Sequence, residues 1–374
     1  MNIYSELEIK EYINAWGTVT TLGGSIIEPE VMEAMSEASQ SFVSMDELHH
    51  KAGIKIAEMI GVESAYITCG AAAGVAISTA ACIAGTDLSK IHSLPDSTFF
   101  NNEVLILKSH RFRYDQGVKI AGGKLKEVGL SDLTLPEQLD NAITEKTVML
   151  LYLAESEKLR GSLPLGLISD ILKSRNIPIV VDAAAEIPPV KNLTNYIKEG
   201  ADLVLFSGGK EMRGPQSSGL ILGNKDLIKA CSANSCPNHG IGRSMKVDKE
   251  TIAGITKAVE LLVKKDYKAE YKRWDNMASN IIKSLAPIDS LIVRKDFPSE
   301  PGIQPTSIPR VYLRINHTKE KISTQNFREI LKNETPGIIC GEDKGEIVLN
   351  MQTLKDGESE IISKTILNIF ASKK

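Results

Sequence analysis

The chain lacks the features that identify several protein classes from sequence. Its cysteines are scattered and form no CxxC pair, which argues against a disulfide framework or a zinc site and fits a reducing compartment. No apolar run approaches the roughly 18 residues of a membrane span, and the N-terminal MNIYSELEIKEY has no apolar signal segment. The net charge of −3 gives no electrostatic case for nucleic acid or an anionic membrane. We therefore expect a cytoplasmic protein with no metal, nucleic-acid or membrane partner.

Two phosphate-binding motifs are also missing, the Walker loop and GxGxxG. What is present is an alternation of apolar strands with helices. Strands are predicted at 64–68, 103–108, 124–129, 147–154, 177–184 and 203–206, with helices between several of them. Fully apolar strands in this rhythm indicate an α/β fold with a mostly parallel sheet wrapped by helices. The strand SGLILG follows too soon for a helical crossover, so we expect it to be antiparallel.

The pattern changes near residue 245. One long helix is predicted from about 249 to 284, and it is followed by strands at 290–297 and 310–316, a helix at 325–333, a hairpin at 337–351 and a last helix near 357–372. This mixture indicates a smaller α+β domain. We expect an N-terminal arm at 1–28, a large domain at 29–245, and a long helix with a small domain at 246–374.

A lysine follows the strand LVLF in the stretch LVLFSGGKEMRG. Lys210 lies after Ser207 and two glycines, where a side chain emerges at the carboxyl end of a strand. Ligands of open α/β sheets bind at that edge. Lys210 is therefore either a nucleophile or an ordinary surface lysine.

Three other features point to the same edge. Asp182 ends the strand IVVD and either caps the next helix or accepts a hydrogen bond from a protonated ring. The segment TCGAAAG places Gly70, Ala71 and Ala72 at a helix N-terminus, which suits a phosphate but also close packing. His110 follows the strand EVLILK and is either structural or stacked on a flat ring.

Together these are the parts of a pyridoxal phosphate site. Lys210 would form the Schiff base, Asp182 would hold the pyridinium proton, His110 would stack on the ring, and the helix N-terminus and Ser207 would hold the phosphate. The order of phosphate loop, stacking residue, aspartate and lysine is that of fold type I pyridoxal phosphate enzymes.

The segments NAWGTVTTLGGS, TCGAAAGVAI, VVDAAAEIPP and FSGGKEMRGPQSSGLILG resemble the family that includes selenocysteine synthase (L-seryl-tRNA selenium transferase) and D-glucosaminate-6-phosphate ammonia-lyase. The resemblance implies a fold type I enzyme, at least dimeric, with its active sites at the subunit interface. It makes Lys210 the Schiff-base lysine and Asp182 the partner of the ring nitrogen. Met351 and Gln352 stand where the family pattern leads us to expect an arginine.

The extended N-terminal motifs resemble the ammonia-lyase branch. The selenocysteine synthase branch that the chain resembles has a further N-terminal tRNA-binding domain. In this chain, by contrast, the core begins almost at Met1. The resemblance therefore implies a lyase that acts on a small hydroxy-amino acid or amino-sugar acid and forms a 2-oxo acid and ammonia by α,β-elimination. The alternatives are a selenium or sulfur transferase on seryl-tRNA and a non-catalytic protein that binds pyridoxal phosphate.

In the elimination, the freed Lys210 is the expected base for the α-proton, and His110 or Glu186 is the expected acid for the leaving hydroxyl. A substrate anion needs cationic or polar contacts. The candidates are Arg160, Arg213, Gln216 and Arg243, and for each arginine a surface salt bridge is an equal alternative.

Overall fold

The computed structural model describes residues 2–299, 302–316 and 322–371. The chain forms two compact units. One contains residues 27–265 and 300–304, and the other contains residues 1–26, 266–299 and 305–374. The division differs from the three predicted segments, and residues 300–304 are one example, since they belong to the larger unit. Residues 246–265 belong to the larger unit, and residues 1–26 belong to the smaller one.

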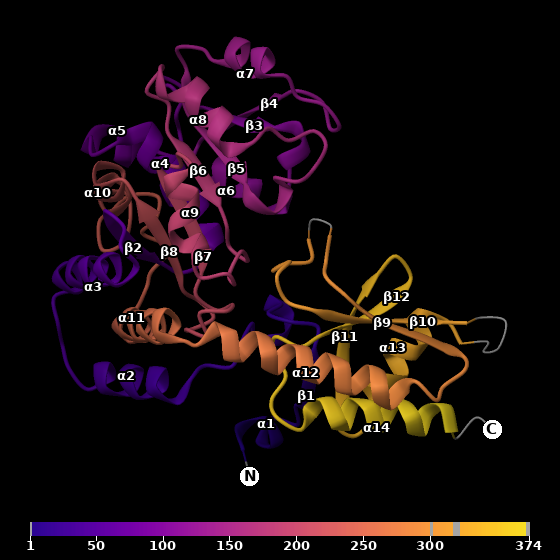
Figure 1. The fold of residues 1–374 in the computed structure, drawn as a ribbon. Coiled ribbons are helices and arrows are strands. Elements are labelled where there is room, and N and C mark those ends of the chain that lie inside the picture. The colour runs from indigo at the N-terminus through magenta and orange to yellow at the C-terminus, as the bar shows by residue number, and fades with distance from the viewer. Residues whose placement is uncertain (1, 300–301, 317–321, 372–374) are drawn as a thin grey trace. The chain divides into compact units, whose positions relative to one another are not determined.

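The larger unit is built on a seven-stranded sheet in the order β2-β8-β7-β6-β5-β3-β4 (Figure 1). Its strands are β2 (Ser64–Thr68), β3 (Glu103–Leu107), β4 (Lys124–Val128), β5 (Thr147–Leu153), β6 (Ile179–Asp182), β7 (Leu203–Ser207) and β8 (Gly219–Gly223). Strands β4, β3, β5, β6 and β7 are parallel. Strand β8 is antiparallel to both β7 and β2, which confirms the prediction for SGLILG.

Helices surround this sheet, as Figure 1 shows. They are α2 (Pro29–Ser39), α3 (Met45–Ile60), α4 (Ala71–Ala84), α5 (Leu88–Ser93), α6 (Gln116–Ile120), α7 (Pro136–Ala142), α8 (Leu165–Lys173), α9 (Asn192–Lys198), α10 (Lys225–Ala233) and α11 (Lys249–Lys264). Helix α4 has apolar residues on nearly every side, and it is accordingly buried along its length. Gly74 of this helix lets it pack against Leu205 and Ile221 of the sheet. The predicted α/β fold is confirmed.

The smaller unit has a five-stranded sheet in the order β1-β11-β12-β10-β9. Its strands are β1 (Tyr12–Ala15), β9 (Leu291–Asp296), β10 (Arg310–Ile315), β11 (Gly337–Asp343) and β12 (Glu346–Asn350). Its helices are α1 (Ile3–Glu6), α12 (Tyr267–Leu285), α13 (Thr324–Asn333) and α14 (Glu358–Ala371). The last helix matches the prediction near 357–372, of which residue 372 lies outside the described range.

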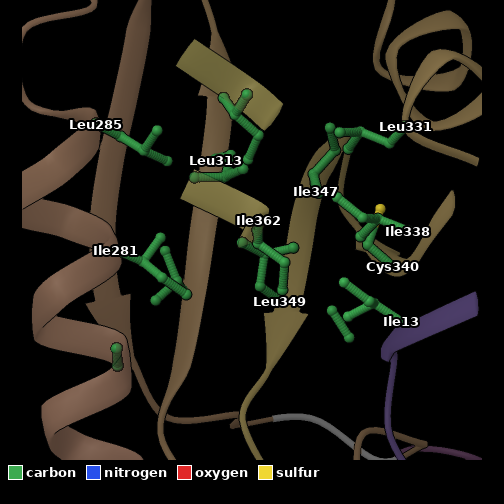
Figure 2. Packing of buried hydrophobic residues seen from close by; sticks show 14 of the residues in the cluster. Ile13, Ile281, Leu285, Leu313, Leu331, Ile338, Cys340, Ile347, Leu349 and Ile362 are labelled. Carbon is green, nitrogen blue, oxygen red and sulfur yellow. The ribbon is translucent and has the colours of Figure 1, made fainter. Parts of the chain in front are cut away.

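One apolar core holds the smaller unit together. Figure 2 shows Ile281 and Leu285 of α12, Leu313 of β10 and Ile13 of β1 among its members. Residues 12–15 pair in parallel with β11, which brings the two ends of the sequence into one sheet. The pairing was not predicted from sequence, because residues 1–28 carry no strand pattern that indicates a partner.

The single long helix predicted over 249–284 is wrong. The structure has two helices, α11 and α12, separated at Lys265 and Asp266. Asp266 takes a non-helical conformation, and its carboxylate accepts a hydrogen bond from the main-chain N–H of Ala269 at 3.1 Å. This N-cap starts a new helix within a continuous helical pattern. The break coincides with the boundary between the two units.

Candidate active site

The carboxyl ends of the central strands meet at one edge of the larger sheet. In the pairing register, Leu153 of β5 lies opposite Asp182 of β6, and Asp182 lies opposite Leu205 of β7. Because β8 is antiparallel to both neighbours, Ser207 and Thr68 lie on either side of Gly219. The segments that follow β2, β5, β6 and β7 therefore all leave the sheet at this edge.

Lys210 lies in the turn after β7. Its side chain is partly buried, and within the described residues its amine forms no ion pair. Burial lowers the pKa of Lys210, and the nearby carboxylates of Asp182, Glu155 and Glu186 oppose that shift. An amine with a lowered pKa in a field of carboxylates is suited to act as a nucleophile and a base.

Asp182 is 5% exposed at the end of β6. Its Oδ1 accepts a hydrogen bond from the main-chain N–H of Ala184 at 3.0 Å. Among the described residues, no protein donor contacts Oδ2, so one oxygen is available to a further donor. Burial raises the pKa of Asp182, and the Ala184 N–H and Lys210 oppose that shift. A ring N–H of a cofactor would supply the missing hydrogen bond.

The N-terminus of α4 forms a cradle made of backbone. Gly70 precedes the helix with φ 138°, and no side chain caps it. The first N–H groups of an α-helix have no partner within the helix, so those of Ala71 and Ala72 are available to an anion. A Cβ at Gly219 would lie 2.6 Å from the carbonyl carbon of Gly70, so only glycine permits this approach. The hydroxyl of Ser207 makes no hydrogen bond within the described part of the chain. The residues present therefore fit pyridoxal phosphate.

His110 lies in a 3-10 turn, Lys108–His110, after β3. The imidazole is fully buried, with 0% exposure. Its Nδ1 accepts a hydrogen bond from the main-chain N–H of Leu153 at 3.0 Å, and its Nε2 lies 2.8 Å from the hydroxyl of Ser162. Burial lowers the pKa of His110 to about 4. An acceptor role at Nδ1 requires a neutral ring with its proton on Nε2.

Two further carboxylates lie at this edge. Glu155 follows β5 in the 3-10 turn Ala154–Ser156, and Glu186 follows β6. Burial raises the pKa of Glu155, and burial together with repulsion from Glu155 raises that of Glu186 to about 7. Sequence reasoning found Glu186 and missed Glu155. A carboxylate just beyond the apolar strand TVMLLYL is the signal that would have found it.

The predicted substrate residues occupy different environments. Arg160 and Arg243 are exposed. Arg213 has φ +51° and donates a hydrogen bond from Nη1 to Glu28 Oε1 at 2.8 Å. Gln216 lies against the turn before Lys210, since its Oε1 would be 2.4 Å from a Cβ placed at Gly209.

Met351 and Gln352, where an arginine was expected, are buried in the smaller unit. In the same sheet, Arg310 lies opposite Asn350 in register and is 1% exposed. Its guanidinium donates to the carbonyl oxygens of Ile308 and Pro305 at 2.8 and 3.2 Å. This arginine supports a loop of its own unit.

In the described part of the chain, no group of three or more His, Cys, Asp or Glu residues is arranged to hold a metal ion. None of the described helices is long and apolar enough to cross a membrane.

Comparisons of the sequence with family models and with known proteins lead to the same family. Residues 12–355 match the family model described as L-seryl-tRNA selenium transferase. D-glucosaminate-6-phosphate ammonia lyase of Salmonella typhimurium is 39% identical over 264 residues, covering 69% of each chain. A 5'-C-glycyluridine monooxygenase-decarboxylase of a Streptomyces species is 31% identical, covering 96% of this chain and 90% of that protein.

Solved structures agree. The structure of D-glucosaminate-6-phosphate ammonia-lyase has a TM-score of 0.87 and 32% identity, and the match covers 100% of this chain and 99% of that one. A serine palmitoyltransferase with a bound pyridoxal phosphate–myriocin adduct has a TM-score of 0.59 at 12% identity, covering 95% of this chain and 86% of that one, which shows the shared fold.

Proposed function

Because the chain belongs to the L-seryl-tRNA selenium transferase family, we propose that it is a lyase of the D-glucosaminate-6-phosphate ammonia-lyase kind. Its cofactor is pyridoxal phosphate. The proposed reaction is α,β-elimination from a small hydroxy-amino acid or amino-sugar acid. The observation that carries the proposal is Lys210, a partly buried lysine with three carboxylates in its field and no ion pair within the described residues.

The residues of this chain have defined roles in the proposal. When bound, pyridoxal phosphate draws electron density from the substrate's α-carbon. Asp182 would offer Oδ2 to the ring nitrogen, and the N–H groups of Ala71 and Ala72 with Ser207 would hold the phosphate. Lys210 would hold the cofactor through its amine, and the free amine would take the α-proton of the substrate.

The elimination balances as follows. The C–O bond at the β-carbon breaks, and the hydroxyl leaves as water after a carboxylic acid of the protein gives it a proton. The β-carbon then gains a proton in place of the lost hydroxyl. Water replaces nitrogen at the α-carbon, so the products are a 2-oxo acid and ammonia. His110 is a poor donor because it is neutral, fully buried and bonded at both nitrogens. Glu186, with a pKa of about 7, is the better acid.

The first test is an absorbance spectrum between about 300 and 500 nm, where pyridoxal phosphate joined to a lysine absorbs. We expect a visible band that Lys210→Ala abolishes. The matched control is Lys191→Ala, since Lys191 is exposed before α9 and should leave the band unchanged. A wild-type protein that stays colourless with added pyridoxal phosphate would refute the proposal.

The second test identifies the reaction. Serine, threonine and 2-amino-2-deoxy sugar acids with and without a phosphate are supplied in turn, and ammonia and 2-oxo acid are measured in equal amounts. Release of carbon dioxide with uptake of oxygen would instead favour the chemistry named for the Streptomyces relative. Amine binding without any product would favour a non-catalytic role.

Transfer of selenium or sulfur to seryl-tRNA is the alternative that the family description offers. It requires RNA affinity that falls steeply with salt. The net charge of −3 supports the small-molecule substrate instead. We expect no binding of serylated tRNA at physiological ionic strength.

Two further features belong to the proposal. The five cysteines are free, which supports a cytoplasmic location. A homodimer with active sites at the subunit interface is the assembly we propose on the basis of family resemblance. Sedimentation analysis at several protein concentrations tests it, and a monomer at all concentrations would contradict it.

A further inference from the structure

The turn that carries Lys210 is closed by hydrogen bonds between main-chain groups. The N–H of Gly214 donates to the carbonyl oxygen of Gly208 at 2.9 Å, which joins the two ends of residues 208–214. Within that stretch, the N–H of Arg213 donates to the carbonyl oxygen of Lys210 at 3.0 Å. We call residues 208–214 the lysine turn. Lys210 and Glu211 lie near its middle.

Helix α11 lies directly behind the ends of the lysine turn. A Cβ at Gly208 would lie 2.5 Å from Cδ1 of Ile255, and a Cβ at Gly214 would lie 3.0 Å from the same atom and 3.2 Å from Cβ of Ala258. Ile255 and Ala258 are fully buried. These contacts fix the two ends of the lysine turn against the helix.

Lys210 is followed by a buried carboxylate. The side chain of Glu211 is 1% exposed, and its Oε1 lies 3.1 Å from Nζ of Lys265, whose side chain is 24% exposed. Burial of a carboxylate is costly unless a cation or a donor is near, so Lys265 stabilises Glu211 in this position. Consecutive Cα atoms are about 3.8 Å apart, so a fixed Glu211 side chain restricts where Lys210 can lie.

Lys265 belongs to the helix that backs the turn. It is the C-cap residue of α11, with φ −65° and ψ 132°, so the chain leaves the helix there. The next residue, Asp266, begins the smaller unit. The middle of the lysine turn is thus joined to the end of α11, while the two ends of the turn pack against Ile255 and Ala258.

We propose that Lys265 is a positioning residue for Lys210. Through its ion pair with Glu211, it holds the lysine turn so that the amine of Lys210 meets the aldehyde carbon of pyridoxal phosphate. The inference rests on the proposed function. In the step that it serves, the nitrogen of Lys210 forms a C=N bond with that carbon, and the aldehyde oxygen leaves as water with the two protons of the amine. Lys265 acts through Glu211 and not on the reacting atoms.

Loss of Lys265 should displace the lysine turn. Removing one partner of a buried ion pair leaves a charge that its surroundings disfavour. The Glu211 carboxylate should then move toward water and draw Lys210 with it. A reaction that depends on a placed group slows by up to about 100-fold when the group shifts by about 1 Å.

The test separates cofactor binding from the joining of Lys210. Cofactor-free full-length protein is mixed with increasing concentrations of pyridoxal phosphate, and the rate at which the visible band appears is measured. The half-saturating concentration reports binding, which depends on the phosphate cradle at α4. The limiting rate at saturation reports the attack by Lys210. Lys265→Met should lower the limiting rate by about 10-fold or more and change the half-saturating concentration by less than about twofold.

Four other variants define the cause. Lys265→Arg keeps the cation and should retain a limiting rate within about threefold of wild type. Glu211→Gln keeps the size of the side chain but loses the charge, and it should lower the limiting rate by about threefold or more. The double variant Glu211→Gln with Lys265→Met should be no slower than Lys265→Met, because the two residues act as one pair. Lys264→Met is the matched control, since Lys264 is 68% exposed in its pair with Glu260 and should keep the wild-type rate.

A wild-type limiting rate in Lys265→Met or in Glu211→Gln would overturn the proposal. A Lys265→Arg variant as slow as Lys265→Met would also overturn it, as would a double variant whose loss is the product of the two single losses. A purely structural role would lower the unfolding temperature and leave the limiting rate unchanged. Thermal unfolding establishes that each variant is folded at the assay temperature. If Lys265→Met does not fold, Glu211→Gln decides, since glutamine leaves no buried charge.

The proposed function can fail separately. A wild-type protein that develops no visible band refutes the cofactor site. A visible band that Lys210→Ala abolishes, with the same limiting rate in wild type and in the Lys265 variants, keeps the cofactor site and refutes the positioning role.

Discussion

Lys210 and Asp182 interact electrostatically at the carboxyl edge of the sheet, yet they form no ion pair within the described residues. A buried lysine and a buried aspartate normally neutralise each other when geometry permits. Here Asp182 ends β6 and Lys210 follows β7, and among the described residues Oδ2 of Asp182 accepts no hydrogen bond and the amine of Lys210 forms no ion pair. The arrangement suits a group that binds between an amine and a carboxylate.

Asp182→Asn tests the role of the carboxylate. Asparagine can still accept the hydrogen bond from Ala184, so we expect the visible band to persist. Loss of the charge opposite the ring nitrogen should lower kcat by about 100-fold or more. Asp202→Asn is the control, because Asp202 precedes β7 at the opposite edge and binds the N–H of Ile179 at 2.8 Å. Equal kcat in Asp182→Asn and wild type would contradict the assignment.

His110 should make the protein less stable in acid. Burial lowers its pKa from 6.5 to about 4, so the unfolded chain binds a proton below about pH 6.5 that the folded chain does not. The free energy of unfolding therefore has its full value above pH 6.5. It falls by up to about 3 kcal/mol as the pH decreases toward 4. Urea unfolding across this range measures it. His110→Gln should have a smaller acid slope, and an identical slope would show that His110 is not responsible.

Gly219→Ala should weaken cofactor binding. The new Cβ would lie 2.8 Å from the main-chain nitrogen of Ala71 and would displace the N-terminus of α4. We expect the dissociation constant of pyridoxal phosphate to rise by about 10-fold or more, since a contact at the phosphate is lost. Gly166→Ala in α8 is the control, because no atom lies within 4 Å of its added Cβ. Unchanged cofactor affinity in Gly219→Ala would place the phosphate elsewhere.

Arg213 and Glu28 should act as a structural pair. Their side chains are 26% and 38% exposed, so solvent screens the interaction. Glu28→Gln and Arg213→Lys should each lower the free energy of unfolding by less than about 1 kcal/mol. Neither should change KM. A rise in KM in Arg213→Lys alone would instead identify Arg213 as a substrate contact.

The sequence was sufficient to predict the strands of the larger sheet and the polar residues that follow their carboxyl ends. Fully apolar strands can only be buried, and a parallel sheet aligns their carboxyl ends, so Asp182 and Lys210 could be assigned to one edge. The glycine-rich segment after Leu205 and Phe206 likewise indicated that the strand ends in a turn at this edge. These inferences depend on local periodicity and topology, which a single sequence contains.

Other features depended on tertiary structure. The neutral tautomer of His110 is set by the N–H of Leu153 and the hydroxyl of Ser162, which are distant in sequence. Burial and repulsion from Asp182 raise the pKa of Glu155, and burial and repulsion from Glu155 raise that of Glu186, which no spacing encodes. Pairing of β1 with β11 is likewise non-local. The sequence by itself determined that Asp182, Glu186 and Lys210 follow the ends of neighbouring strands; the packing around them decided how their pKa values shift, because desolvation and charge coupling act through space.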